Sequence, residues 1–143
     1  AGGIERTRGL AKKINADLAI IDKRRPQAGK SQVMNIIGDV KNKDCIIVDD
    51  IIDSGGTIVN AVEALKKKGA LDVYVFITHA VLSGEAINKI KKSKIKKLII
   101  TDSIDNSQRI KNISKIQVLS IAPLMAEAIK RISNSTSVSD LFN

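Results

Sequence analysis

The stretch of the chain with the clearest chemical potential, residues 45–57, reads CIIVDDIIDSGGT. Two adjacent carboxylates, Asp49 and Asp50, come directly after four apolar residues, and a third acid, Asp53, follows three positions later. Acidic side chains next to a buried strand are costly unless a positively charged partner is expected there. Because the stretch then breaks into Gly-Gly, it indicates a ligand site at a strand-to-helix turn.

Each part of this stretch suits one part of a phosphorylated sugar. The carboxylates of Asp49 and Asp50 can hold ribose hydroxyl groups or a hydrated Mg²⁺, which prefers one or two carboxylates together with substrate oxygens. Asp53 can accept further sugar hydroxyl groups or act as a base. The next four residues supply backbone N–H groups and two hydroxyl groups at a helix N-terminus, a natural phosphate site. They are Ser54, Gly55, Gly56 and Thr57.

Each feature also has a purely structural interpretation. Asp53 or Ser54 alone can serve as a helix N-cap, and Gly55-Gly56 alone can form a tight turn. The ordered combination of all three features after a buried strand favours a binding site.

Alternating strands and helices must position these residues. Apolar runs predict strands over residues 18–22, 33–38, 45–49, 72–78, 97–101 and 116–121. Apolar residues at helical spacing predict helices over residues 3–14, 58–69, 84–93 and 123–132, and the polar stretch 23–32 predicts a loop. This alternation predicts an α/β fold with a mostly parallel sheet and helices on both faces, in a single domain spanning 1–143. Ligands of such folds bind at the carboxyl ends of the strands.

The composition of the chain argues against nucleic-acid binding and against a membrane span. The net charge of +9 arises largely from lysine clusters that suit solvated helix ends, and aromatic residues form only 2% of the chain, so we expect no nucleic-acid partner. No apolar run has the length of a membrane span. Cys45 is interpreted as a small buried hydrophobe and His79 as a structural residue, and a single cysteine fits a reducing cytoplasm.

Five stretches of the chain resemble one enzyme family. VDDIIDSGGT is similar to the phosphoribosyl-pyrophosphate binding motif of type I phosphoribosyltransferases, whose fold we therefore expect. Within that group, the chain resembles the C-terminal half of the ribose-phosphate pyrophosphokinase family in order and spacing. The matching stretches are residues 20–26, 33–40, 49–57, 78–87 and 137–142.

The resemblance implies a reaction in which ribose 5-phosphate and ATP give phosphoribosyl pyrophosphate and AMP with Mg²⁺. Residues 54–57 would hold the 5-phosphate beside Asp53, and Asp49 and Asp50 would contact the ribose hydroxyl groups and the metal. Lys23 and Arg25 match the pair on the family's catalytic loop, where they would stabilise charge on the transferring phosphates. The alternative for this basic stretch is a solvated loop.

The resemblance also implies partners and regulation. Ser137, Ser139 and Phe142 match a segment that in relatives helps form a regulatory phosphate or nucleotide site at a subunit interface. Asp140 stands where the family commonly has Tyr, and its carboxylate would repel an anionic effector. We expect a homo-oligomer, a dimer or a hexamer, and an N-terminal domain that is missing here. The isolated chain would then be inactive.

Two other functions stay open at this point. One is a phosphoribosyltransferase that consumes phosphoribosyl pyrophosphate, against which the basic stretch 23–26 argues. The other is a non-catalytic subunit associated with phosphoribosyl pyrophosphate synthetases. A site that no longer catalyses a reaction has no physical need for the full set of acidic and basic residues, which argues against the non-catalytic subunit.

Overall fold

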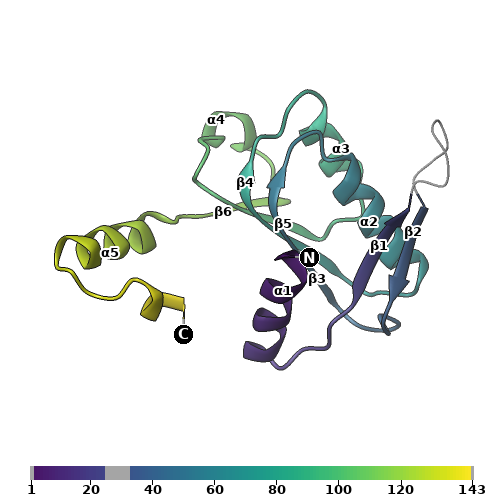
Figure 1. The fold of residues 1–143 in the computed structure, drawn as a ribbon. Helices are drawn as coiled ribbons and strands as arrows, with labels where there is room; N and C mark the ends of the chain where they lie inside the picture. The colour runs from purple at the N-terminus through teal and green to yellow at the C-terminus, as the bar shows by residue number, and fades with distance from the viewer. Residues whose placement is uncertain (1, 25–32, 143) are drawn as a thin grey trace.

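The computed structural model describes residues 2–24 and 33–142 of the chain (Figure 1). From β3 onward helices and strands alternate, as the sequence predicts, whereas β1, β2 and β3 follow one another without a helix between them. Their order is α1 (Gly2–Lys13), β1 (Ile20–Arg24), β2 (Val33–Ile37), β3 (Cys45–Ile52), α2 (Gly56–Lys67), β4 (Val73–Ala80), α3 (Ala86–Lys92), β5 (Lys97–Thr101), α4 (Ser107–Ile110), β6 (Ile116–Leu119), α5 (Ala122–Ser133) and the 3₁₀ helix η1 (Ser139–Phe142).

The strands form two sheets. β3, β4, β5 and β6 lie side by side in chain order and are all parallel, while β1 and β2 form a separate antiparallel pair. In the parallel sheet, Val48 of β3 lies opposite Phe76 of β4, which in turn lies opposite Ile99 of β5. The predicted α/β class with a mostly parallel sheet flanked by helices is confirmed.

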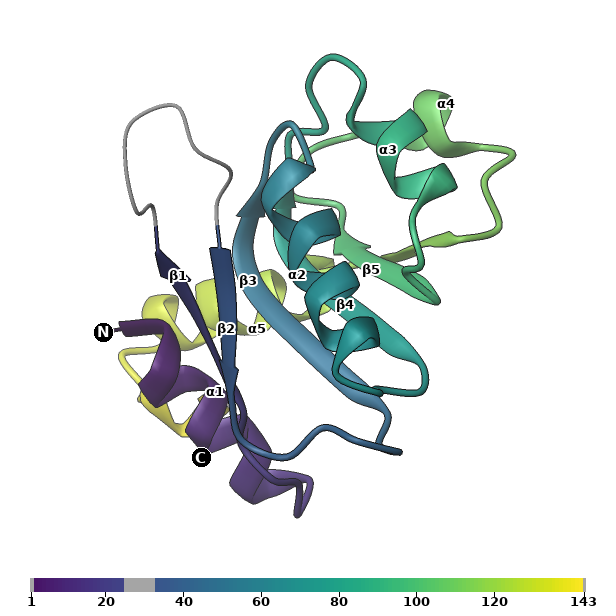
Figure 2. The ribbon, with the colours of Figure 1, turned by 90° about the vertical axis from the view of Figure 1, so that its right-hand side faces the viewer.

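The core lies between the parallel sheet and the helices α2 and α3 (Figure 2). From β4, Val73, Val75 and Ile77 point into it because alternate residues of a strand share a face. Helix α2 covers these strands with a buried stripe at helical spacing, namely Ile58, Ala61, Val62 and Leu65. The stripe ends before Gly69, whose φ of +91° suits the glycine that commonly follows a helix.

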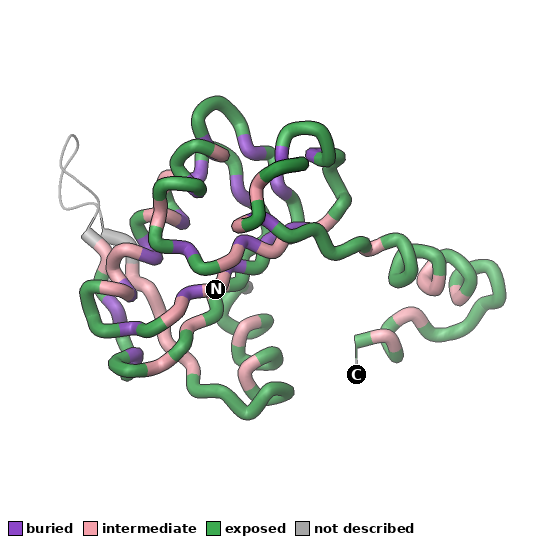
Figure 3. Tube along the Cα trace, turned by 180° about the vertical axis from the view of Figure 1, so that it is seen from behind, coloured by how far each residue is buried: buried purple, intermediate pink, exposed green. Residues whose placement is uncertain are grey.

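Helical cover of the sheet is unequal. On the face opposite α2, the side chains of Ile46, Val48 and Phe76 remain between 37% and 45% exposed. Helix α5 extends away from the sheet (Figure 1) and has no buried residue, so its trace lacks the buried colour in Figure 3. The buried residues therefore concentrate around the α2 and α3 side of the sheet.

Three local differences from the sequence expectations matter for the site. Strand β3 extends to Ile52, three residues beyond its predicted end. Strand β1 extends to Arg24, so the predicted loop start at residue 23 is wrong, and residues 25–32 lie outside the described residues. The four-residue helix α4 was not predicted, because a single turn shows no hydrophobic period. In the described part of the chain, no helix is long and apolar enough to span a bilayer.

Candidate functional site

The loop between β3 and α2 has the backbone geometry that a glycine provides. Gly55 has φ +77° and ψ −10°, in the left-handed region that other residues rarely adopt. Gly55 also occupies the N-cap position of α2, and no side chain caps this helix. The structural interpretation of Asp53 or Ser54 as an N-cap is therefore wrong.

The carbonyl groups of this loop point back into the protein. The carbonyl oxygen of Ile52 accepts hydrogen bonds from the amides of Val81 (3.0 Å) and Leu82 (3.2 Å). The carbonyl oxygen of Asp53 accepts a hydrogen bond from the amide of Ser83 (3.1 Å). The backbone that follows β4 thus holds the carbonyl groups at the start of this loop in place.

Two further carbonyls complete this pattern. The carbonyl oxygen of Ser54 accepts a hydrogen bond from Lys89 Nζ of α3 at 3.2 Å. The carbonyl oxygen of Gly55 receives the amide of Val59 at 3.0 Å, the first bond of helix α2. The ammonium group of Lys89 also brings a positive charge to the back of the loop.

The amides that begin helix α2 are the candidate donors of this site. Within the described residues, the amides of Ser54, Gly55, Gly56 and Thr57 donate no hydrogen bond. These donors lie at the positive end of the dipole of a 12-residue helix, and the side chains of Asp53, Ser54 and Thr57 are exposed beside them. This arrangement can bind an anion such as a phosphate group.

Asp49 and Asp50 lie inside β3 rather than after it. Strict alternation of faces is not kept through this part of the strand, since Cys45 and Ile47 pack against the core before it and Ile52, not Ile51, is buried after it. That both carboxylates serve one ligand stays a prediction. The carboxylate of Asp49 accepts a hydrogen bond from the amide of Asp50 at 3.0 Å. Both side chains are exposed, so each is accessible to a ligand.

A metal ion bound at this site would take some of its coordinating oxygens from a bound ligand. Among the described residues, no group of three or more His, Cys, Asp or Glu side chains is placed to hold a metal ion. One or two carboxylates are nevertheless the usual protein contribution to Mg²⁺, and phosphate oxygens and water complete its shell. Asp49, Asp50 and Asp53 therefore fit a metal that arrives with a phosphorylated ligand, and do not fit a site made of protein alone.

A hollow of about 800 Å³ lies beside this site, between α1, β1 and β3. Apolar side chains such as Ile4, Leu10 and Ile21 contribute to its lining, which also includes Asp49 but none of residues 53–57. The lining also includes Ile58 of α2, so the hollow reaches the residue that follows the anion-binding loop, residues 54–57, without being lined by the loop itself.

Of the two predicted catalytic residues, Lys23 and Arg25, the structure describes only the backbone of Lys23. The backbone of Lys23 belongs to β1 and lies opposite Met34 of β2. Arg25 lies outside the described residues. Their assignment to catalysis stays a prediction.

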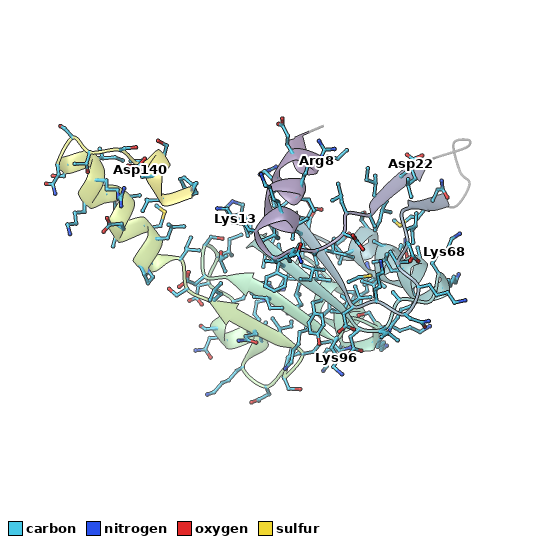
Figure 4. The ribbon with its side chains drawn as sticks, turned by 90° about the horizontal axis from the view of Figure 1, so that it is seen from below. Arg8, Lys13, Asp22, Lys68, Lys96 and Asp140 are labelled. Atoms are coloured by element: carbon cyan, nitrogen blue, oxygen red, sulfur yellow. The ribbon has the colours of Figure 1, made fainter. Side chains whose placement is uncertain are left out.

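The structure brings the predicted regulatory residues near one another. The hydroxyl oxygens of Ser137 and Ser139 are 2.9 Å apart and hydrogen-bonded, and Phe142 is 63% exposed at the end of η1. Lys13 of α1 donates a hydrogen bond to the carbonyl oxygen of Phe142 at 2.9 Å, and Figure 4 shows Lys13 on the side of α1 that faces the segment with Asp140. A regulatory role for this segment stays a prediction.

Cys45 is less buried than the sequence predicts, whereas the contacts of His79 agree with the structural role predicted for it. Cys45 is half-buried rather than fully buried, and burial raises the pKa of its thiol. His79 is exposed and its Nδ1 lies 2.9 Å from the hydroxyl oxygen of Ser103, which fits a structural hydrogen bond.

Sequence reasoning missed the residues that hold the loop from behind. The stretch 78–87 was recognised only as part of a family pattern, and Lys89 only as one member of a lysine cluster. Neither has a local signal for its contact with residues 52–54, because the contacts join segments about 30 residues apart.

Both the sequence and the fold are similar to known proteins. The family model described as the phosphoribosyl synthetase-associated domain matches residues 8–143. Ribose-phosphate pyrophosphokinases of Hyphomonas neptunium and Brucella melitensis are 54% and 56% identical, and each alignment covers 99% of this chain and 46% of the relative. The crystal structure of phosphoribosylpyrophosphate synthetase from Mycobacterium smegmatis matches with a TM-score of 0.81 and 35% identity, over 94% of this chain and 43% of that one.

These matches also correct one expectation. The chain spans about half the length of the curated relatives it matches. The more specific expectation, that it corresponds to the C-terminal half of such enzymes, is not supported and is set aside. Since the family model matches nearly the whole chain, the chain belongs to the phosphoribosyl synthetase-associated domain family.

Proposed function

We propose that this chain is the ribose-phosphate-binding part of a ribose-phosphate pyrophosphokinase. Such an enzyme transfers a pyrophosphoryl group from ATP to ribose 5-phosphate and forms phosphoribosyl pyrophosphate and AMP. The names of the similar proteins support this reaction. The structural observation that carries the proposal is the start of helix α2, where the carbonyls of residues 52–55 are hydrogen-bonded within the protein while the amides of residues 54–57 donate no hydrogen bond to the described residues.

The 5-phosphate is the part of the substrate that this loop suits best. Amides at a helix N-terminus make charge-assisted hydrogen bonds to phosphate oxygens, which are stronger than bonds between neutral groups. The hydroxyl groups of Ser54 and Thr57 add two further donors at the rim. Gly56 keeps this rim open, because a Cβ built on it has no neighbour within 4 Å.

The acidic residues take the sugar ring and the metal in this proposal. Asp53, directly before the amides, accepts hydrogen bonds from ribose hydroxyl groups. Asp49 and Asp50 bind the remaining hydroxyl groups and Mg²⁺. When bound, Mg²⁺ neutralises part of the charge on the transferring phosphates.

Lys23 and Arg25 stabilise the developing charge on the phosphates of ATP in this proposal, which rests on the family resemblance of the stretch 20–26. Guanidinium and ammonium groups lower the barrier of phosphoryl transfer by electrostatic stabilisation, and not by covalent chemistry.

The remaining part of the longer enzyme is the main partner in this proposal. The relatives are about twice as long as this chain, so the part that holds ATP is expected outside it. We therefore expect the isolated chain to bind ribose 5-phosphate without making product. Assembly into a homo-oligomer, regulation through Ser137, Ser139 and Phe142, and a cytoplasmic location stay predictions.

Calorimetric titration with ribose 5-phosphate, with and without Mg²⁺, tests the proposal. We expect saturable binding to the chain and loss of binding in the double variant Asp53→Ala, Thr57→Ala. The matched control, Asp39→Ala with Thr136→Ala, removes the same groups from exposed positions outside the loop and should bind like the original chain. The proposal fails if the chain shows no binding, or if the loop variant binds as well as the control.

The same material distinguishes the transferase alternative. Release of pyrophosphate from phosphoribosyl pyrophosphate that depends on an added nucleobase would support a phosphoribosyltransferase instead.

A further inference from the structure

The loop that follows β4 has an unusual backbone. Leu82 has φ +53°, which is rare for a residue with a branched side chain, yet this residue is fully buried. A strained conformation of this kind persists only where its surroundings hold it in place. The amides of residues 81–83 are the ones that bind the carbonyls of Ile52 and Asp53, so the strain lies directly behind the anion-binding loop.

Asn106 supports the start of this loop. Among the described residues it is the only buried polar side chain, with 4% exposure. Its Nδ2 donates a hydrogen bond to the carbonyl oxygen of Ala80 at 2.7 Å. Its backbone carbonyl accepts the amides of Arg109 and Ile110, so the asparagine is fixed by the first turn of α4.

Arg109 supports the next two residues of the loop. Its guanidinium donates to the carbonyl oxygen of Val81 at 3.3 Å and to the carbonyl oxygen of Leu82. It also donates to the side-chain oxygen of Asn106 at 3.0 Å, so the two side chains act as a unit. The planar fork of arginine can reach two carbonyls and an amide oxygen at once, which an ammonium group cannot do with the same geometry.

These bonds form a continuous connection to the ligand site. Asn106 and Arg109 hold the carbonyls of residues 80–82, and the amides of residues 81–83 hold the carbonyls of residues 52 and 53. Behind Gly55, a Cβ would come within 3.7 Å of Ala86, which follows the same loop. The orientation of the amides in residues 54–57 thus depends on contacts with a segment some 30 residues further along the chain.

We propose that Asn106 and Arg109 are positioning residues for the anion-binding loop. They act through the strained segment 80–83 and do not touch the ligand. Without them, the segment relaxes, the carbonyls of Ile52 and Asp53 lose their fixed partners, and the amides of residues 54–57 change their orientation. The proposal rests on the proposed function only for the identity of the ligand, ribose 5-phosphate.

Nuclear magnetic resonance of the ¹⁵N-labelled 143-residue chain tests this inference. The variant is Arg109→Met, which keeps an unbranched stem and removes the guanidinium donors. The control is Arg131→Met, because Arg131 also donates from its guanidinium to a side chain and to a backbone carbonyl, those of Glu127 and Ser137 on α5 and after it. The readouts are the amide signals of residues 54–57, their hydrogen exchange, and the dissociation constant for ribose 5-phosphate.

In Arg109→Met we expect displaced amide signals and faster exchange at residues 54–57 before any ligand is added. The dissociation constant should rise about tenfold, the scale of one lost hydrogen bond to a charged group. The control should leave these signals and the affinity unchanged. Arg109→Lys should recover only part of the effect.

Unchanged signals and affinity in a folded Arg109→Met variant would overturn the inference. If that variant does not fold, Arg109→Lys and Asn106→Ser are judged by the same signals. If the original chain does not bind ribose 5-phosphate, the proposed function fails, while the signals of the ligand-free loop still decide whether Asn106 and Arg109 position it.

Discussion

Replacement of Gly55 by alanine tests the conformation on which the anion-binding loop depends. Alanine at this position would have to keep a φ of +77°, and the left-handed conformation costs an L-residue about 1–2 kcal/mol. Steric clash adds little, because the new Cβ would meet only Ala86 at 3.7 Å, an ordinary van der Waals contact. We therefore expect the free energy of unfolding to fall by about 1–2 kcal/mol and the unfolding midpoint by roughly 2–8 °C.

Gly9→Ala provides a control for which the expected change in the free energy of unfolding has the opposite sign. Gly9 lies within α1, and a Cβ built on it has no neighbour within 4 Å. Alanine favours a helix over glycine by roughly 0.5–1 kcal/mol, so this variant should be as stable as the original chain or slightly more stable. The same chemical change is thus expected to destabilise one position and not the other.

Urea unfolding followed by far-ultraviolet circular dichroism measures both variants, and titration with ribose 5-phosphate measures the loop. Gly55→Ala should also weaken binding, because relief of the strain rotates the amides of residues 54–57. If Gly55→Ala were as stable as Gly9→Ala, the loop would not be left-handed at this residue. The set of available amides at residues 54–57, on which the proposed phosphate site depends, would then be wrong.

Three further predictions concern the core and the titrating groups. Leu98→Ala, at a fully buried position, should cost about 2–5 kcal/mol in urea unfolding, whereas Leu71→Ala, half exposed, should cost less than about 1 kcal/mol; equal losses would place the core elsewhere. Because burial raises the pKa of the Cys45 thiol, its alkylation by iodoacetamide at about pH 8 should be slower than that of glutathione, and a faster reaction would contradict this burial. Hydrogen bonds from the Ser120 hydroxyl and from the amide of Ile121 lower the pKa of the Asp102 carboxyl. The stabilising effect of this carboxylate is therefore present above the ordinary aspartate pKa and is lost as the pH falls through the lowered pKa. Asp102→Asn should accordingly lower the melting temperature near about pH 7 and have little effect near about pH 2, and a difference that is independent of pH would refute this assignment.

The sequence by itself determined the elements and the chemistry of the loop. The apolar run of β3 and the helical spacing of α2 are local patterns, and both elements form where they predict. The succession of acid, hydroxyl and glycine over residues 53–57 is also local, so the turn and its suitability for phosphate could be read directly. The resemblance to the ribose-phosphate pyrophosphokinase family relied on the same short stretches.

Tertiary structure decided how these parts are oriented. The continuation of β3 through Asp49 and Asp50 to Ile52 depends on pairing with β4 up to Ala80. The inward direction of the carbonyls at residues 52–54 depends on partners at residues 81–89, and these depend in turn on Asn106 and Arg109. Hydrophobic periodicity carries no information about such bonds, because they join segments that only the folded chain brings together.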